Sequence, residues 1–239
     1  MAGEDKEFVF ADISLLVEYC APYFEDYEYS EKVVEYYGSS GGEFIISKGT
    51  FYKLNNKINN RKRLWNHLIR EATEHIKDDS LSEVDFKSDV LNYTSLEKNL
   101  EFGLDNEYHP DIQSLRSIVE DTGLEEFRNL VDNYRTVAKV QRKELEFNKE
   151  FNTFSRHGSG SPWDIEAALT DIVDSTAQFE ALLDFAHWRR TNQGIYLIGC
   201  MSKICQDKSR AENIVEPLTN NNNVDIYSSK EVCESVLTV

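Results

Sequence analysis

The 239-residue sequence has few cysteines and few basic residues. Its four cysteines form neither a CxxC pair nor a zinc-ligand pattern with histidine, so we expect free thiols in a reducing compartment. Only 26 Lys and Arg stand against 43 Asp and Glu, which gives a net charge of −17. This excess of acid argues against a broad electrostatic grip on nucleic acid, because phosphate binding needs clustered cations.

Long apolar runs are also missing. No stretch approaches the roughly 20 residues of a membrane-spanning helix, and the N-terminus MAGEDKEFVFADI lacks the basic and apolar regions of a secretory signal. We therefore expect a soluble, cytoplasmic, acidic protein with no membrane partner. Hydrophobic residues (40%) and aromatic residues (12%) are still sufficient for a packed core.

Apolar patterning separates the two ends of the chain from its middle. Short apolar runs at 8–11, 43–46, 195–198 and 224–227 predict strands, with helical patterns between them. Strands separated by helices predict a parallel sheet. The middle predicts helices over 61–77, 110–123 and 124–151, short helices and loops over 78–110, and a loop over 155–162. We therefore expect a single domain with its core at about 1–60 and 162–239 and a mainly helical insertion at about 61–161.

Three short motifs follow one another along the chain. The segment Phe8–Leu16 predicts a strand followed by Asp-Ile-Ser-Leu-Leu, Glu43–Ser47 predicts a strand before a helix, and Asp184–His187 is a D-x-x-H before another predicted strand. In these motifs the chain resembles the PIN-domain (PIN-like) nuclease family. The resemblance implies an α/β, PIN-like three-layer fold with a parallel central sheet and a mainly helical insertion.

The resemblance also implies a metal site. Family members cut RNA with one or two Mg²⁺ or Mn²⁺ ions, which prefer carboxylate oxygens and activate a bound water. Matching residue by residue makes Asp12 and Asp184 the expected catalytic and metal-binding residues, with Ser14 supporting Asp12. On this hypothesis the protein is a divalent-metal-dependent endoribonuclease that cuts RNA phosphodiester bonds.

Two positions depart from the family pattern. Lys53 stands where the family has a glutamate, and Met201, with Ser202 beside it, stands where the family has an acid after the fourth strand. A nearby cation repels a metal ion, and Lys53 could instead form an ion pair with Asp12 or Asp184. We therefore favour a degenerate metal site and a binding or regulatory module related to RNA nucleases. The alternative is an active ribonuclease that recruits a replacement acid, of which the chain offers Asp171, Asp174 and Asp207.

Simpler interpretations stand beside these. Asp12 could be a helix N-cap, Asp184 a solvated helix acid, and His187 a packed helix residue. The basic cluster over 61–70 is either a solvated helix face or a phosphate contact in which Trp65 stacks on a base. RNA, a protein partner bound through the helical insertion, and a second copy of the chain are the candidate partners.

Overall fold

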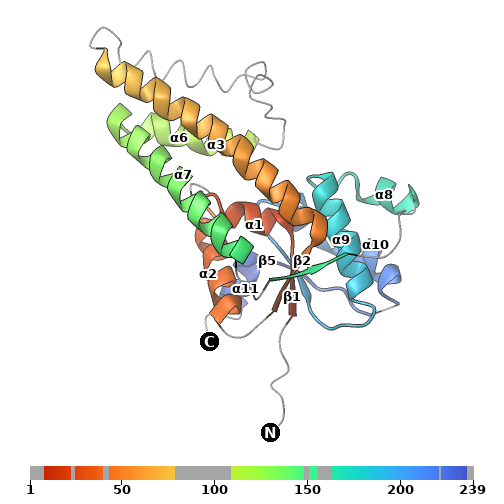
Figure 1. Cartoon of the computed structure of the whole chain (residues 1–239). Helices are drawn as coiled ribbons and strands as arrows, with labels where there is room; N and C mark the ends of the chain where they lie inside the picture. The colour runs from red at the N-terminus through yellow and green to blue at the C-terminus, as the bar shows by residue number, and fades with distance from the viewer. Residues whose placement is uncertain are drawn as a thin grey trace. The chain divides into compact units, whose positions relative to one another are not determined.

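The structure is a computed structural model that describes residues 8–22, 25–39, 43–78, 109–147, 151–155, 163–220 and 222–235 (Figure 1). The chain divides into two compact units. Unit 1 comprises 1–19, 26–55 and 143–239, and unit 2 comprises 20–25 and 56–142. The loops expected over 78–110 and 155–162 lie almost entirely outside the described residues.

Unit 1 contains a five-stranded parallel sheet in the order β3-β2-β1-β4-β5. Its strands are β1 (Phe8–Ala11), β2 (Glu43–Ser47), β3 (Phe151–Phe154), β4 (Ile195–Ile198) and β5 (Ile226–Ser228). The central strand β1 pairs with β2 on one side and with β4 on the other. The predicted α/β class and parallel sheet are thus confirmed. Because parallel strands end at one edge of the sheet, Asp12 lies at the edge where α/β proteins place their sites.

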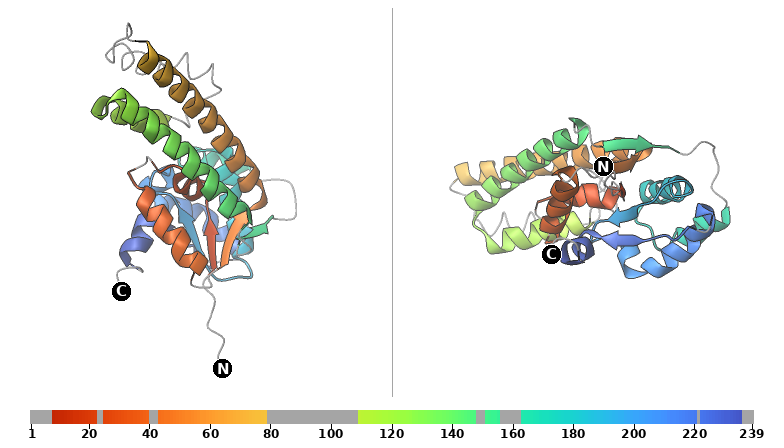
Figure 2. Two further views of the ribbon diagram at one scale, coloured as in Figure 1. Left: turned by 60° about the vertical axis from the view of Figure 1, so that its left-hand side comes forward. Right: turned by 90° about the horizontal axis from the view of Figure 1, so that it is seen from below.

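Helices cover both faces of this sheet (Figure 2). One face carries α1 (Ile13–Tyr19), α2 (Tyr27–Ser39) and α11 (Ser229–Ser235), and the other carries α8 (Trp163–Leu169), α9 (Thr176–Trp188) and α10 (Lys208–Val215). Two 3₁₀ turns, Lys203–Gln206 and Glu216–Thr219, flank α10. The result is a three-layer α/β arrangement. A sheet covered on both faces buries successive positions of its central strand, here Val9–Ala11, which explains the continuous apolar run of β1.

The core of unit 1 is aromatic where β1 meets α9. Phe10 is fully buried, and its ring centroid lies 5.7 Å from that of Phe185 in α9 and 6.0 Å from that of Tyr196 in β4. Such edge-to-face and offset pairs stabilise beyond their buried area. This packing fixes α9 against the sheet and so positions the polar residues that α9 carries.

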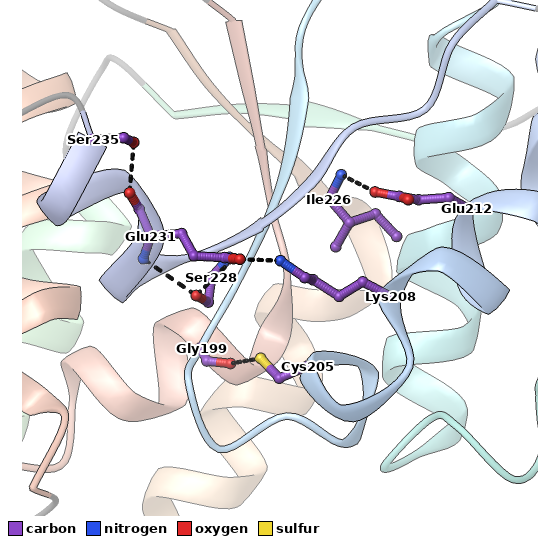
Figure 3. Close-up of polar contacts among 8 residues, drawn as sticks. All are labelled: Gly199, Cys205, Lys208, Glu212, Ile226, Ser228, Glu231 and Ser235. Atoms are coloured by element: carbon purple, nitrogen blue, oxygen red, sulfur yellow. Dashed lines mark hydrogen bonds and ion pairs between the residues drawn. The ribbon is translucent and has the colours of Figure 1, made fainter.

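The closing helix α11 begins with a capping box. Ser228 Oγ accepts from the Glu231 N–H at 3.3 Å, and Glu231 Oε2 accepts from the Ser228 N–H at 2.8 Å (Figure 3). The cap is therefore Ser228, the residue directly before α11. Lys208 of α10 pairs with the same Glu231 carboxylate, which joins the starts of α10 and α11.

Unit 2 is helical. The helix α3 (Lys48–Lys77) begins in unit 1 and continues without interruption, so the expected boundary near residue 60 is not a break in secondary structure. Unit 2 also contains α6 (His109–Asp121) and most of α7 (Leu124–Phe147). Its buried apolar side chains come from all three helices and include Leu64, Trp65, Leu68, Val119, Phe127 and Val131.

The strand β3 corrects the sequence prediction. The long helix expected to reach residue 151 ends at Phe147, and Phe151–Phe154 forms a strand at the sheet edge beside β2. Its pairing partner lies about a hundred residues earlier, and Asn152 Nδ2 donates to Glu43 Oε2 at 3.2 Å. The sheet therefore includes part of the segment that the sequence assigned to the insertion.

Candidate functional site

Asp12 lies directly after β1 and is fully buried. Its Oδ2 accepts from the backbone N–H of Ser14 at 2.8 Å and from the Ser14 hydroxyl at 2.5 Å. Because α1 begins at Ile13, the first of these bonds is an N-cap interaction. Asp12 therefore caps α1, as the simpler interpretation of the sequence held, and Ser14 supports its carboxylate.

Two further donors complete the surroundings of Asp12. Gln178 of α9 donates from Nε2 to Oδ2 at 2.8 Å, and Tyr196 of β4 donates its hydroxyl to Oδ1 at 2.5 Å. Burial, together with the nearby charges of Asp12 and Asp184, raises the pKa of Tyr196 well above its usual value, so this hydroxyl stays protonated. Four donors of the protein itself therefore bind the Asp12 carboxylate, three at Oδ2 and one at Oδ1.

Asp184 lies on α9 near the same edge of the sheet. It is only 6% exposed, and its Oδ2 accepts from the Ser47 hydroxyl at 2.6 Å, so Asp184 is not a solvated helix acid. Its charge acts on Tyr196, the residue that also contacts Asp12. Both Asp12 and Asp184 thus lie close enough to Tyr196 for their charges to act on its hydroxyl, which is bonded to Asp12.

Of the three proposed replacement acids, only Asp174 approaches Asp12. Burial raises the pKa of Asp174, and the negative charge of Asp12 adds to the shift, whereas the hydrogen bond from the Lys203 N–H opposes it. Asp171 is exposed and pairs with Arg210 at 3.8 Å, and Asp207 is an exposed residue before α10. Asp174 also binds Gln178, because its backbone N–H donates to Gln178 Oε1 at 2.8 Å.

Lys53 does not replace a metal ion at this site. Among the described residues, no ion pair joins Lys53 to Asp12 or Asp184, so that interpretation of the sequence is wrong. Gln178 instead contacts both Asp12 and Ser202, donating from Nε2 to Ser202 Oγ at 2.8 Å. Ser202, which neighbours the position of the missing family acid, is buried and also caps the turn at Lys203–Gln206.

The residues around Asp12 do not fit Mg²⁺ or Mn²⁺ in this arrangement. Such ions need several oxygen ligands at 2.0–2.2 Å or so, whereas both oxygens of Asp12 are already bonded to protein donors. In the described part of the chain, the ligand atoms of Asp12, Asp174 and Asp184 do not all lie within 4.8 Å of one another. Those of a second group do.

That second cluster consists of Glu18, Asp26 and Cys200, each offering one ligand atom, and these atoms lie within 4.8 Å of one another. Glu18 is buried in α1, and burial raises its pKa to about 7. Burial and the charge of Glu18 raise the pKa of the Cys200 thiol to about 11. Sequence reasoning missed this cluster because its members show no motif spacing.

Gly199 permits the approach of the loop that carries Cys200. A Cβ atom at Gly199 would lie 2.8 Å from the Ser14 carbonyl oxygen and 3.0 Å from a Glu18 carboxylate oxygen. The Gly199 N–H donates to Ser14 Oγ at 3.0 Å, and its carbonyl accepts from the Cys205 thiol at 3.4 Å (Figure 3). Gly199 therefore lies between the Asp12 site and the Glu18 cluster and contacts both.

Comparisons with protein-family models, with curated proteins and with solved structures find no significant match. Within the described ranges, no helix has both the length and the apolar character needed to cross a membrane.

Trp65 is only 1% exposed, so its indole is not available to stack on a base.

Proposed function

We propose that this chain is a PIN-like module that binds single-stranded RNA without cleaving it. The order of elements supports the PIN-like assignment: Asp12 follows β1, the Asp184–His187 motif lies on α9 immediately before β4, and α10, β5 and α11 close the chain. The four protein donors bonded to the two oxygens of Asp12 are the observation that supports the absence of cleavage.

The helix α3 supplies the binding surface of the proposal. In a chain with a net charge of −17, the 23 residues from Lys48 to Arg70 contain seven Lys or Arg and no Asp or Glu. Of these seven, Arg61 is buried, and Arg70 pairs with Glu71, the next residue along the chain. A local excess of cations in an acidic protein selects one surface for a polyanion, because the remainder repels it. Phosphate contacts of this kind supply most of the affinity for nucleic acid.

The arrangement of the exposed side chains along α3 also suits the binding of RNA. Spacings of three and four residues place one stripe on one face of the helix. Its exposed members are Lys48, Tyr52, Asn56, Asn59, Arg63, Asn66 and Arg70. Tyr52 is 71% exposed, an unusual exposure for a tyrosine ring. Cations and amides bind phosphate and sugar, and an exposed ring provides a stacking platform for bases.

Fluorescence anisotropy with a labelled, unstructured RNA oligonucleotide tests the binding. Stacking on an aromatic ring contributes about 1–3 kcal/mol per base. Tyr52→Ala should therefore weaken binding by roughly 5- to 100-fold, and Tyr52→Phe should preserve it. Lys48→Ala with Arg63→Ala should reduce the dependence of affinity on salt, whereas Lys139→Ala, at an exposed position of α7, should not. Failure of the unaltered protein to bind RNA at low salt would refute the RNA ligand.

An active ribonuclease is the second candidate, and the position of Asp174 near Asp12 favours it. Calorimetric titration with Mn²⁺, followed by incubation with the same RNA, separates the two. We expect neither binding at Asp12 nor cleavage, and equal heats for the unaltered protein and Asp12→Asn. Cleavage that requires Mn²⁺ and disappears in Asp12→Asn and Asp174→Asn would instead establish the nuclease.

A further inference from the structure

We propose that the free edge of β5 is a pairing site for the same strand of a second copy of this chain, and that the carboxylates of Glu212 and Glu231 keep this edge closed. Among the described strands, β5 stands last in the sheet order and pairs on one side only, with β4. An edge strand of this kind is a template for another chain. All the groups involved belong to unit 1, and the inference does not depend on the function proposed above.

Alternate residues of β5 face β4 and the free edge. The Tyr196 N–H donates to the Asp225 carbonyl at 2.9 Å, and Ile226 is the register partner of Tyr196. In a parallel ladder the residues on either side of Ile226, namely Asp225 and Tyr227, therefore bond to β4. The backbone groups of Ile226 and Ser228 point away from β4. A strand added at this edge would have to bind them.

Both of these outward N–H groups are already bonded to side chains (Figure 3). The Ile226 N–H donates to Glu212 Oε1 at 3.0 Å, and the Ser228 N–H donates to Glu231 Oε2 at 2.8 Å. Each carboxylate thus takes the place that a carbonyl of a neighbouring strand would occupy. Glu212 comes from α10 on one face of the sheet and Glu231 from α11 on the other, so helices of both outer layers close the edge.

Helix capping explains only one of the two bonds. The bond between Ser228 and Glu231 belongs to the capping box of α11. Glu212 lies within α10 and has no part in that cap, yet it binds the Ile226 N–H in the same way. Lys208 pairs with Glu231 and so fixes the second carboxylate at the edge. The closure of the β5 edge is therefore the feature that both carboxylates share.

Without the two carboxylates, the β5 edge matches its own copy. Two β5 strands related by a two-fold axis run antiparallel, so Tyr227 lies opposite Tyr227 of the second copy. Ile226 of each copy then exchanges two hydrogen bonds with Ser228 of the other. Tyr227 is 39% exposed, and aromatic pairs across antiparallel strands are stabilising. Donors, acceptors and exposed rings are thus complementary, which identifies a second copy as the partner.

Size-exclusion chromatography of the full chain with light scattering tests the closure. Glu212→Ala combined with Glu231→Ala should double the mass of the particle that the unaltered protein forms. Glu212→Gln combined with Glu231→Gln is the matched control, because it removes the same two charges but keeps oxygens that accept the N–H groups. This control should keep the unaltered mass. Adding Tyr227→Lys to the alanine variant should abolish the increase, because like charges directly opposite each other repel.

Amide hydrogen exchange at low protein concentration gives a second readout, which does not require association. The Ile226 and Ser228 amides should both be protected in the unaltered protein. Glu212→Ala, which leaves the α11 cap intact, should speed exchange at Ile226 roughly 10- to 100-fold and leave Ser228 unchanged. Circular dichroism of each variant excludes misfolding as the cause.

Three outcomes would overturn the proposal: Ile226 exchange that is equal in Glu212→Ala and the unaltered protein, an alanine double variant that keeps the unaltered mass, or a gain in mass that persists with Tyr227→Lys. Neither readout involves RNA or a metal ion, so this test and the RNA-binding test can fail independently.

Discussion

The hydroxyl of Tyr196 donates to Asp12 Oδ1 at 2.5 Å, and both side chains are completely buried. Tyr196 lies on β4, and Asp12 directly follows β1, the strand with which β4 pairs. A buried carboxylate is costly unless every acceptor position is satisfied. This pair is therefore a structural bond of the core and also an obstacle to metal binding.

Tyr196→Phe should destabilise the fold. The change leaves a charged, buried oxygen without its donor, and hydrogen bonds to charged groups contribute about 1.5–3 kcal/mol. Urea denaturation should show a loss of free energy of unfolding in this range. Tyr227→Phe, on the adjacent strand β5 and 39% exposed, should stay within about 0.5 kcal/mol of the unaltered protein. Equal stability of both variants would contradict the assigned role of Tyr196.

Gln178→Glu tests whether the glutamine occupies the place of a metal ligand. The variant puts a third carboxylate next to those of Asp12 and Asp174, so repulsion should destabilise the protein at pH 7. Lowering the pH should restore stability, because one of the carboxylates then binds a proton. If Mn²⁺ also restores the melting temperature at pH 7 in Gln178→Glu but not in Gln178→Leu, the site is one substitution from holding a metal.

The free energy of unfolding of the protein should fall as the pH rises from about 5 to about 7.5. Glu18 has an ordinary pKa of 4.5 and a pKa of about 7 in the fold, chiefly because of burial. The folded state therefore retains a proton that the unfolded chain has already released, and this stabilisation is complete below pH 4.5 and lost by pH 7. The loss is on the order of 3 kcal/mol. Glu18→Gln should flatten this part of the profile, and Glu35→Gln, exposed on α2, should not.

Gly199→Ala should be destabilising and Gly49→Ala should not. A methyl group at Gly199 would come within 2.8 Å of the Ser14 carbonyl oxygen and 3.0 Å of Glu18, so the loop after β4 must move. We expect a cost of about 1–3 kcal/mol. Gly49, in the first turn of α3, has open space at the same position, and alanine there should stabilise the helix by up to about 1 kcal/mol. Thermal denaturation of the two variants provides the comparison.

Local patterns predicted the fold well where one segment determines its own structure. The strands β1, β2 and β4 fall where the apolar runs predicted them. The strand β3 was not predicted because it forms only by pairing with β2, which is distant in the sequence. Asp12 and Asp184 were found because each follows or forms part of a motif. Gln178, Tyr196 and Ser202 were not, because a neutral residue in a helix or strand gives no sign that it will contact a buried acid.

The pairing of β1 has a consequence for the folding of the chain during its synthesis. Val9 pairs with Ile195 in the completed sheet, so during synthesis the central strand lacks one neighbour until the residues up to β4 have left the ribosome. At roughly 5–20 residues per second this wait lasts on the order of 10–40 s. Throughout that interval a fully apolar Val-Phe-Ala segment has one unpaired edge. Nascent chains of this protein should therefore be strong clients of chaperones that recognise short aromatic and aliphatic stretches.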